Sequence, residues 1–349
     1  MKFAATLIAI VVAVAVLSSC RGEARTYYVS TTGSDTATGT TNQPWRTLRK
    51  GLTALMPGDT LYIHGGTYTE RLNDIAIVPG SRDLPIRVAA CPGEKPELKG
   101  LLWLKEPSYW TVDGLNVSWD PATGQPNEHM VKLTNGVGWT LENADISGAC
   151  SYAAVLVAGG KSGEPDDWRI CNNRIHDTHR ANKINQDHLI YVNTGLDAGH
   201  GIVERNLVFN CENGSGIKLG GPKLVGGSVN VVVRFNTIYN TVDSVLVAGL
   251  SHDNQIYGNL LGKTDKTYSG IRGYRLSGHG NVARDNGFFE TRGAIHNDAG
   301  YPGIVDAGGN NMVKDDRLVA RVHHVDEKPG VASDVPIGFA APAYFVQGP

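Results

Sequence analysis

The chain has 349 residues, including 43 glycines, and a formal net charge of -2 with a pI near 6.6. That charge gives no general attraction for nucleic acid, so we expect no nucleic-acid partner, and affinity for a charged polymer would have to come from a local patch. Glycine makes up about 12% of the chain against a usual value of about 7%, which favours a turn-rich β protein.

The first 20 residues read as an export signal. Lys2 precedes an apolar run from Phe3 to Leu17, which is shorter than the roughly 20 residues of a membrane-spanning helix. The sequence Leu17-Ser18-Ser19-Cys20 follows and resembles the lipobox of bacterial lipoproteins. The resemblance implies a lipoprotein signal peptide over residues 1–20, lipidation of Cys20, and contact with a membrane only through that lipid. Ordinary secretion with an incidental cysteine is the alternative. Either way, the remaining four cysteines would lie where disulfides can form, and their spacing selects no pairing.

A short helix is expected near the N-terminus. Leu48, Leu52 and Leu55 fall at helical spacing and Pro57-Gly58 follows them, which predicts an amphipathic helix over residues 46–55. Such a helix can cover the open end of a stack of strands and hide its unpaired edge.

Asparagines recur in a fixed setting along the middle of the chain. Each has an apolar residue three positions before it and another two positions after it. The asparagines are Asn173, Asn206, Asn236, Asn259, Asn286 and Asn310, and successive ones are 33, 30, 23, 27 and 24 residues apart. Leu115 and Ala144 take the same position upstream. An asparagine at one corner of every coil can bond the next coil and tolerates the left-handed region.

A second short strand follows these repeated turns at a short distance, from the turn at Ala144 onward. These segments are Ala154–Val157, Leu189–Val192, Gly216–Leu219, Ser244–Val247, Gly270–Arg272 and Gly293–His296. Units of this size cannot bury their own apolar face and must stack. We therefore predict an all-β fold, a right-handed parallel β-helix over residues 26–325, with residues 326–349 as a tail or cap and the molecule a monomer.

The segment from Tyr27 to Tyr68, with YYVSTTGSD, PWRTL and PGDTLYIHGGTY, resembles the N-terminal cap of extracellular right-handed β-helix proteins. These include polysaccharide lyases of the chondroitinase B and family-nine pectate lyase types. The resemblance covers residues 26 to about 320 and implies the fold more specifically than the substrate.

Alignment of the second strands on their inward residues places five side chains in one outward column: Tyr191, Lys218, Leu246, Arg272 and His296. Coils are about 4.8 Å apart, so long side chains of this column could reach one bound sugar. β-Elimination of an acidic polysaccharide needs a base and a cation on the uronate carboxylate. Lys218 is the candidate base, Arg272 or a metal the carboxylate partner, and Tyr191 or His188 the proton donor.

The family-nine lyases resemble this chain in a strand GFKLGG whose lysine is the base, matched here by Ile217-Lys218-Leu219-Gly220-Gly221. They also carry an aspartate cluster that holds calcium, of which this chain keeps only Asp187. One carboxylate does not supply the six to eight oxygens that Ca²⁺ takes, so calcium is possible but its acidic cluster is incomplete. Asp187, His176, Arg180 and His296 are expected to bind substrate, His176 and Arg180 from a long loop between coils.

Two other function classes remain open. A β-helix glycoside hydrolase would need paired carboxylates, and Asp187 and Asp243 begin strands two coils apart. A surface lipoprotein that binds glycans or builds envelope structure without catalysis is the other. We expect an exported polysaccharide lyase whose partner is an acidic polysaccharide. Five tryptophans near strand starts are expected to pack at edges rather than to form sugar platforms: Trp103, Trp110, Trp119, Trp139 and Trp168.

Overall fold

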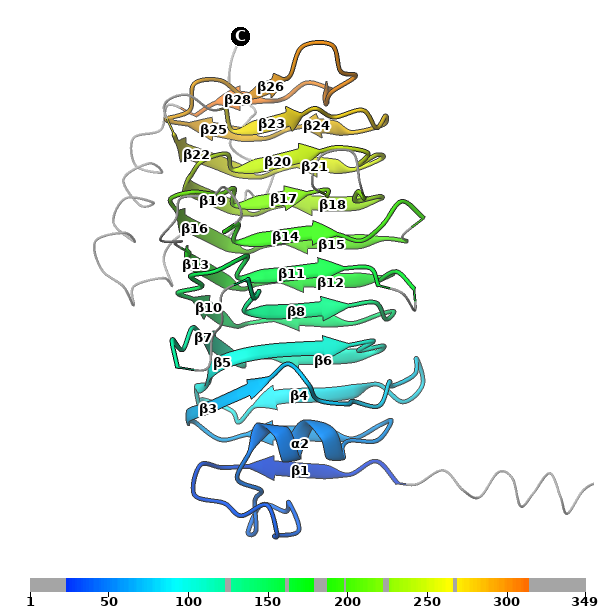
Figure 1. The fold of residues 1–349 in the computed structure, drawn as a ribbon, viewed down its shortest axis with the longest axis vertical. Coiled ribbons are helices and arrows are strands. Elements are labelled where there is room, and N and C mark those ends of the chain that lie inside the picture. The colour runs from blue at the N-terminus through cyan, green and yellow to red at the C-terminus, as the bar shows by residue number, and fades with distance from the viewer. Residues whose placement is uncertain are drawn as a thin grey trace, which may run out of the picture.

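The computed structural model describes residues 23–122, 127–160, 163–178, 187–197, 199–221, 226–265 and 269–313. Over these residues the chain winds into a parallel β-helix with three faces, stacked from β1 at one end to β26 and β28 at the other (Figure 1). The all-β solenoid predicted from the repeat is confirmed. The expected signal segment with Cys20, Arg180 and the tail from residue 326 lie outside the described residues. No helix within the described ranges is long and apolar enough to cross a membrane.

The first face is a ladder of eleven strands, one from each coil. Its members pair in parallel, and they are β1 (Thr26–Val29), β2 (Thr60–Ile63), β4 (Ile86–Ala90), β6 (Trp110–Asp113), β9 (Thr140–Glu142), β12 (Trp168–Cys171), β15 (Gly201–Glu204), β18 (Val231–Arg234), β21 (Gln255–Tyr257), β24 (Val282–Arg284) and β27 (Val305–Asp306).

From β2 onward, each first-face strand is followed after a short corner by a strand of the second face. The members of the second face are β3 (Gly66–Leu72), β5 (Pro96–Lys105), β7 (Asn116–Ser118), β10 (Asp145–Ser147), β13 (Arg174–Thr178), β16 (Leu207–Cys211), β19 (Thr237–Thr241), β22 (Leu260–Thr264), β25 (Gly287–Phe289) and β28 (Asn311–Met312).

The third face carries the strands predicted to hold the site. They are β8 (Val131–Thr134), β11 (Val155–Ala158), β14 (Ile190–Asn193), β17 (Ile217–Leu219), β20 (Val245–Ala248), β23 (Ile271–Tyr274) and β26 (Ile295–Asn297). The long strand β5 joins the two faces, because its first half pairs with β7 and its second half with β8. Alternate residues point inward, and the inward positions Ile190, Ile217, Val245 and Ile271 are fully buried.

The helix α2 (Leu48–Ala54) lies at the β1 end of the stack (Figure 1), slightly shorter than predicted. Thr47 caps it by accepting a hydrogen bond from the Lys50 amide. Leu48 and Leu52 are buried, and a Cβ on Gly51 would lie 2.7–2.8 Å from side-chain atoms of Val29 and Leu61. The glycine thus lets the helix sit directly on the first-face strands, which confirms its capping role.

The repeated asparagines form one continuous buried ladder at the corner between the first and second faces. Each side-chain amide donates to the Oδ1 of the next asparagine, at 2.9–3.1 Å from Asn173 through Asn310. Each Oδ1 also accepts from the backbone amide one coil before, and the Ala144 amide donates to Asn173 Oδ1 at 3.0 Å. Ala144 therefore occupies the asparagine position, as the repeat predicted.

The ladder asparagines do not use their tolerance of the left-handed region. The residue before each ladder position adopts that region instead, with φ of +56° at Asn172, +53° at Arg205 and +56° at Phe235. The ladder side chain must point into the corner to reach the next coil, so the preceding residue makes the turn.

Trp110, Trp139 and Trp168 are buried, and the rings of Trp139 and Trp168 stack with centroids 5.4 Å apart. These three pack inside the coil, which confirms that they are not sugar platforms. Trp103 is instead half-buried beside Lys132, and its Nε1 donates to Thr134 Oγ1 at 3.0 Å. All four described cysteines, Cys91, Cys150, Cys171 and Cys211, are free thiols.

Candidate functional site

The outward column predicted on the third face is confirmed by the strand register. Tyr191 pairs with Lys218, Lys218 with Leu246, Leu246 with Arg272, and Arg272 with His296. The column also continues toward the N-terminus through three residues that sequence reasoning did not assign to it: Leu156, Lys132 and Trp103.

Lys218 is the central cation of this column. Its side chain is half-buried, and its Nζ lies 4.8 Å from the centroid of the Tyr191 ring. Burial lowers the pKa of Lys218 from 10.5 to about 8. Among the described residues, no carboxylate forms an ion pair with its amine. A lysine in this setting is partly neutral near pH 8 and can accept a proton.

Tyr191 and His188 pack beside Lys218. Burial raises the pKa of Tyr191 to about 12, so the phenol stays protonated and can act as a proton donor. The His188 ring meets the Tyr191 ring edge-on at 5.7 Å, and its Nδ1 accepts a hydrogen bond from the Ser215 amide at 3.0 Å. Burial, and then the charge of Lys218, hold the pKa of His188 well below its usual value. His188 is thus a neutral, buried ring under Tyr191.

A second aromatic and basic group lies on the preceding coils. His129 lies 6.2 Å from Tyr191 between ring centroids, and burial, with Lys132 next, lowers its pKa to about 3. Lys132 lies 3.9 Å and Lys105 4.2 Å from the Trp103 ring centroid. The outward position of Lys132 could have been found by extending the alternating pattern back to Val131–Thr134.

Arg272 forms an ion pair within the protein. Its Nη2 lies 3.3 Å from Asp298 Oδ1, and its guanidinium lies 5.0 Å from the Tyr274 ring centroid. His296 is exposed, with Nε2 3.8 Å from the same Asp298 oxygen. Arg272 lies two coils beyond Lys218 and His296 three coils beyond it, and both contact the Asp298 carboxylate.

Asp243 lies just before β20, two residues before the inward Val245. The corresponding positions on the two preceding coils are Ser215 and His188, by the strand register. Burial raises the pKa of Asp243 to about 7, against an opposing effect of Arg272. This aspartic acid is buried in the corner that supports Lys218 and Arg272.

Asp187 is fully buried, and its carbonyl accepts a hydrogen bond from Cys211 Sγ at 3.0 Å. Among the described residues, one group of three His, Cys, Asp or Glu side chains has its ligand atoms within 4.8 Å of one another. It lies on the first coils and consists of His64, Cys91 and Glu94. Around Lys218, the described residues show no second group of three such ligand atoms.

His176 was expected in a loop, and this is wrong. It lies in β13 on the second face. Its ring stacks on Phe209 with centroids 4.7 Å apart, and its Nε2 lies 2.9 Å from Asp145 Oδ1 and its Nδ1 2.6 Å from Asp177 Oδ2. These hydrogen bonds raise its pKa against the effect of burial. The structure does not bring His176 into the Lys218 column.

A polar groove of about 590 Å³ runs along the corner of the first and second faces, with Glu97, Asp145 and Arg174 in its lining. It does not include Lys218. Two of its charged groups are engaged within the protein, since Arg174 meets Asp145 at 2.9 Å and Glu97 accepts from Ser118 at 2.6 Å. The desolvated amine on the third face is the better candidate for proton-transfer chemistry.

Comparison with known proteins finds relatives that share the right-handed β-helix. A curated relative, the pectate lyase PEL9 of Emericella nidulans, is 27% identical over 175 residues, which cover 41% of this chain and 42% of that protein. The chain thus matches less than half the length of that relative.

Two solved structures share the fold. The structure of XylC in complex with xylose matches with a TM-score of 0.52 at 15% identity. The match covers 78% of this chain and 70% of the XylC chain. The GH136 lacto-N-biosidase of Eubacterium ramulus has a TM-score of 0.50 at 14% identity, with 82% and 68% covered. At these identities the likeness shows the fold alone.

Residues 27–212 match the family model described as Pel9A-like, right-handed β-helix region, and they make up more than half of the chain. The match covers the N-terminal cap, the start of the asparagine ladder and most of the column before Lys218. The chain belongs to the Pel9A-like right-handed β-helix family.

Proposed function

We propose that this protein is an exported polysaccharide lyase that cleaves a uronic-acid-containing polysaccharide by β-elimination. The observation that carries the proposal is Lys218, an amine on the outward face whose pKa burial lowers to about 8 and which pairs with no described carboxylate. Membership of the Pel9A-like family and the pectate lyase relative support the substrate class.

In the proposed reaction the neutral amine of Lys218 removes the proton next to the uronate carboxylate. The released electron pair forms the C4–C5 double bond, and the C4–O bond to the neighbouring sugar breaks. The leaving oxygen takes a proton from the Tyr191 phenol, which lies on the adjacent coil and is protonated at neutral pH. His188 does not touch the sugar in this scheme and positions the Tyr191 ring.

Arg272 is the proposed partner of the substrate carboxylate. It lies two coils from Lys218, about 10 Å along the axis, and shares Asp298 with His296. A uronate that displaces Asp298 from Arg272 would have its charge neutralised, which makes the neighbouring proton more acidic. No step of this scheme passes through calcium.

The test is a screen of the purified protein against pectate, alginate, chondroitin, heparinoids and glucuronans, with and without chelator. We expect an ultraviolet-absorbing unsaturated product from one acidic polymer, lost in Lys218→Ala and kept in the matched variant Lys99→Ala, an exposed lysine on the second face. Unsaturated product that persists unchanged in Lys218→Ala would overturn the assignment. New reducing ends without the double bond would indicate a hydrolase, and no product from any polymer would favour a non-catalytic glycan-binding or structural protein.

A further inference from the structure

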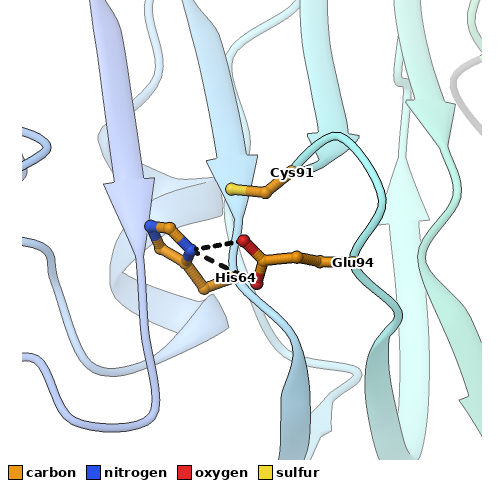
Figure 2. Close-up of side chains that lie close together, drawn as sticks. All are labelled: His64, Cys91 and Glu94. Atoms are coloured by element: carbon orange, nitrogen blue, oxygen red, sulfur yellow. Dashed lines mark hydrogen bonds and ion pairs between the residues drawn. The ribbon is translucent and has the colours of Figure 1, made fainter.

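Three side chains of different chemistry lie close together at the corner of the first two complete coils (Figure 2). This corner is several coils from Lys218 along the stack. The side chains are those of His64, Cys91 and Glu94, and their ligand atoms all lie within 4.8 Å of one another. His64 Nδ1 lies 3.0 Å from Glu94 Oε1 and 3.3 Å from Oε2. The proposed reaction uses none of the three.

The parallel register brings the first two ligands together. β2 and β4 pair with Ile63 beside Ala90, and the Cys91 amide donates to the Ile63 carbonyl at 2.9 Å. One step further along both strands, His64 and Cys91 therefore occupy neighbouring positions on adjacent coils.

A tight turn brings the third ligand to the same side. Cys91-Pro92-Gly93-Glu94 closes with a hydrogen bond from the Glu94 amide to the Cys91 carbonyl at 2.9 Å. Gly93 has φ of +78°, so with proline before it the segment is a type II turn. The two-residue gap between Cys91 and Glu94 is the spacing that paired ligands of structural zinc sites use.

Neighbouring groups hold the donors in place. The Gly65 amide donates to Glu94 Oε2 at 2.6 Å, which fixes the carboxylate. Tyr68 Oη donates to the His64 carbonyl at 2.8 Å, and the Tyr28 ring stacks on the imidazole at 6.0 Å between centroids. Such supporting contacts orient ligands before a metal binds.

We propose that His64 Nδ1, Cys91 Sγ and a Glu94 carboxylate oxygen bind one Zn²⁺ ion, with water in the fourth position, and tie the first coils together. The donor set of one nitrogen, one thiolate sulfur and one oxygen suits Zn²⁺, whereas Ca²⁺ and Mg²⁺ prefer oxygens alone. At zinc bond lengths the ligand atoms of a tetrahedral site lie roughly 3.3–3.8 Å apart, so the present arrangement closes with side-chain movements of about 1 Å.

The test measures Zn²⁺ binding to the untagged, reduced full chain by titration calorimetry, and Co²⁺ binding by absorption spectroscopy. We expect one Zn²⁺ per chain, a rise in Tm with zinc, and a thiolate-to-cobalt charge-transfer band. His64→Ala and Cys91→Ser each remove a ligand, so each should weaken zinc binding by at least about 100-fold, the upper end of the effect of losing a contact that only orients a ligand. The band should disappear in Cys91→Ser.

Two matched variants serve as controls. His252→Ala removes a histidine that pairs with Asp253 at 2.8 Å, and Cys150→Ser removes another free thiol. Both should bind zinc as the wild type does. Glu94→Gln, at an exposed side chain, keeps the test valid if Cys91→Ser fails to fold. Absence of zinc binding in the wild type, or binding that neither Cys91→Ser nor Glu94→Gln weakens, would overturn the site. Because the readouts are binding and spectra, the result is independent of any lyase activity.

Discussion

Lys218 and Asp243 both have pKa values shifted toward neutrality by burial. Both are removed from water, and burial disfavours their charged forms, so the pKa of the lysine falls to about 8 and that of the aspartic acid rises to about 7. They belong to successive coils, since Lys218 pairs with Leu246 in the strand that Asp243 precedes. Perturbed groups of this kind are concentrated at functional sites.

The first prediction concerns the pH dependence of activity. The base form of Lys218 is the neutral amine, so kcat/KM should rise with pH and level off above about pH 8. Lys218→Arg keeps a positive charge at every accessible pH and should lower kcat by about 100- to 10,000-fold, the range of general-base effects. The measurement is product absorbance across pH 6–10. If the rise of kcat/KM near pH 8 remained in Lys218→Arg, that rise would belong to the titration of another group.

The second prediction concerns stability. The pKa of Asp243 is raised from 3.8 to about 7, so the folded state binds a proton that the unfolded state has lost between these values. The stabilisation is present below about pH 4 and is lost as pH rises through 7. Asp243→Asn removes this loss. Relative to its effect at pH 4, it should raise the free energy of unfolding at pH 8 by up to about 4 kcal/mol.

Urea unfolding at pH 4 and pH 8 measures this difference. The matched variant is Asp83→Asn, at an exposed turn position, which should change neither value. An Asp243→Asn effect that is the same at both pH values would contradict a raised pKa.

At the scale of elements, the asparagine ladder holds the corner of each coil in register with the next. Asn236 donates to Asn259 Oδ1 at 3.0 Å and to the Val203 carbonyl at 2.9 Å, and accepts from both amides of Asn206. These groups are buried, so a missing partner leaves neighbouring donors and acceptors unsatisfied. The ladder therefore specifies which residues lie opposite each other on the third face.

The third prediction is that Asn236→Ala lowers the free energy of unfolding by about 3 kcal/mol, because it leaves a buried amide and carbonyl without partners. Asn240→Gly is the control. It removes an exposed bond from Asn240 to Asn210 and keeps the left-handed conformation at φ of +54°, so it should cost less than about 1 kcal/mol. Equal losses in chemical denaturation would mean that the ladder does not set the stability of the corner.

At the scale of the whole molecule, stability is distributed along the stack. Each coil contacts only its neighbours, so the terminal coils depend on caps. At one end α2 buries Leu48 and Leu52 against the first coils, while at the other end β27 and β28 are exposed. The molecule should therefore open from its ends.

The fourth prediction tests this by amide hydrogen exchange. β27 and β28 should exchange first, and β17 and β20 last. Leu52→Ala leaves a cavity under α2 and should speed exchange in β1 and β2 while leaving β17 and β20 unchanged. Faster exchange along the entire stack would show that the solenoid opens as one cooperative unit.

The sequence by itself determined the coils and the Lys218 column. Apolar periodicity fixes which residues point inward, the ladder asparagines fix the coil length, and strict alternation then places Lys218 beside Tyr191. These features are periodic, so they can be read along the chain without knowing how distant side chains meet.

Only the tertiary structure decided what happens at corners and loops, where no periodicity applies. It buried His188 and Asp187, paired Arg272 with Asp298, placed His176 in a strand, and brought His64 next to Cys91 and Glu94. Burial, ion pairing and metal-ligand geometry depend on side chains from different coils whose directions are set by packing. The sequence therefore located the candidate base, and the packing decided its proton affinity and its neighbours.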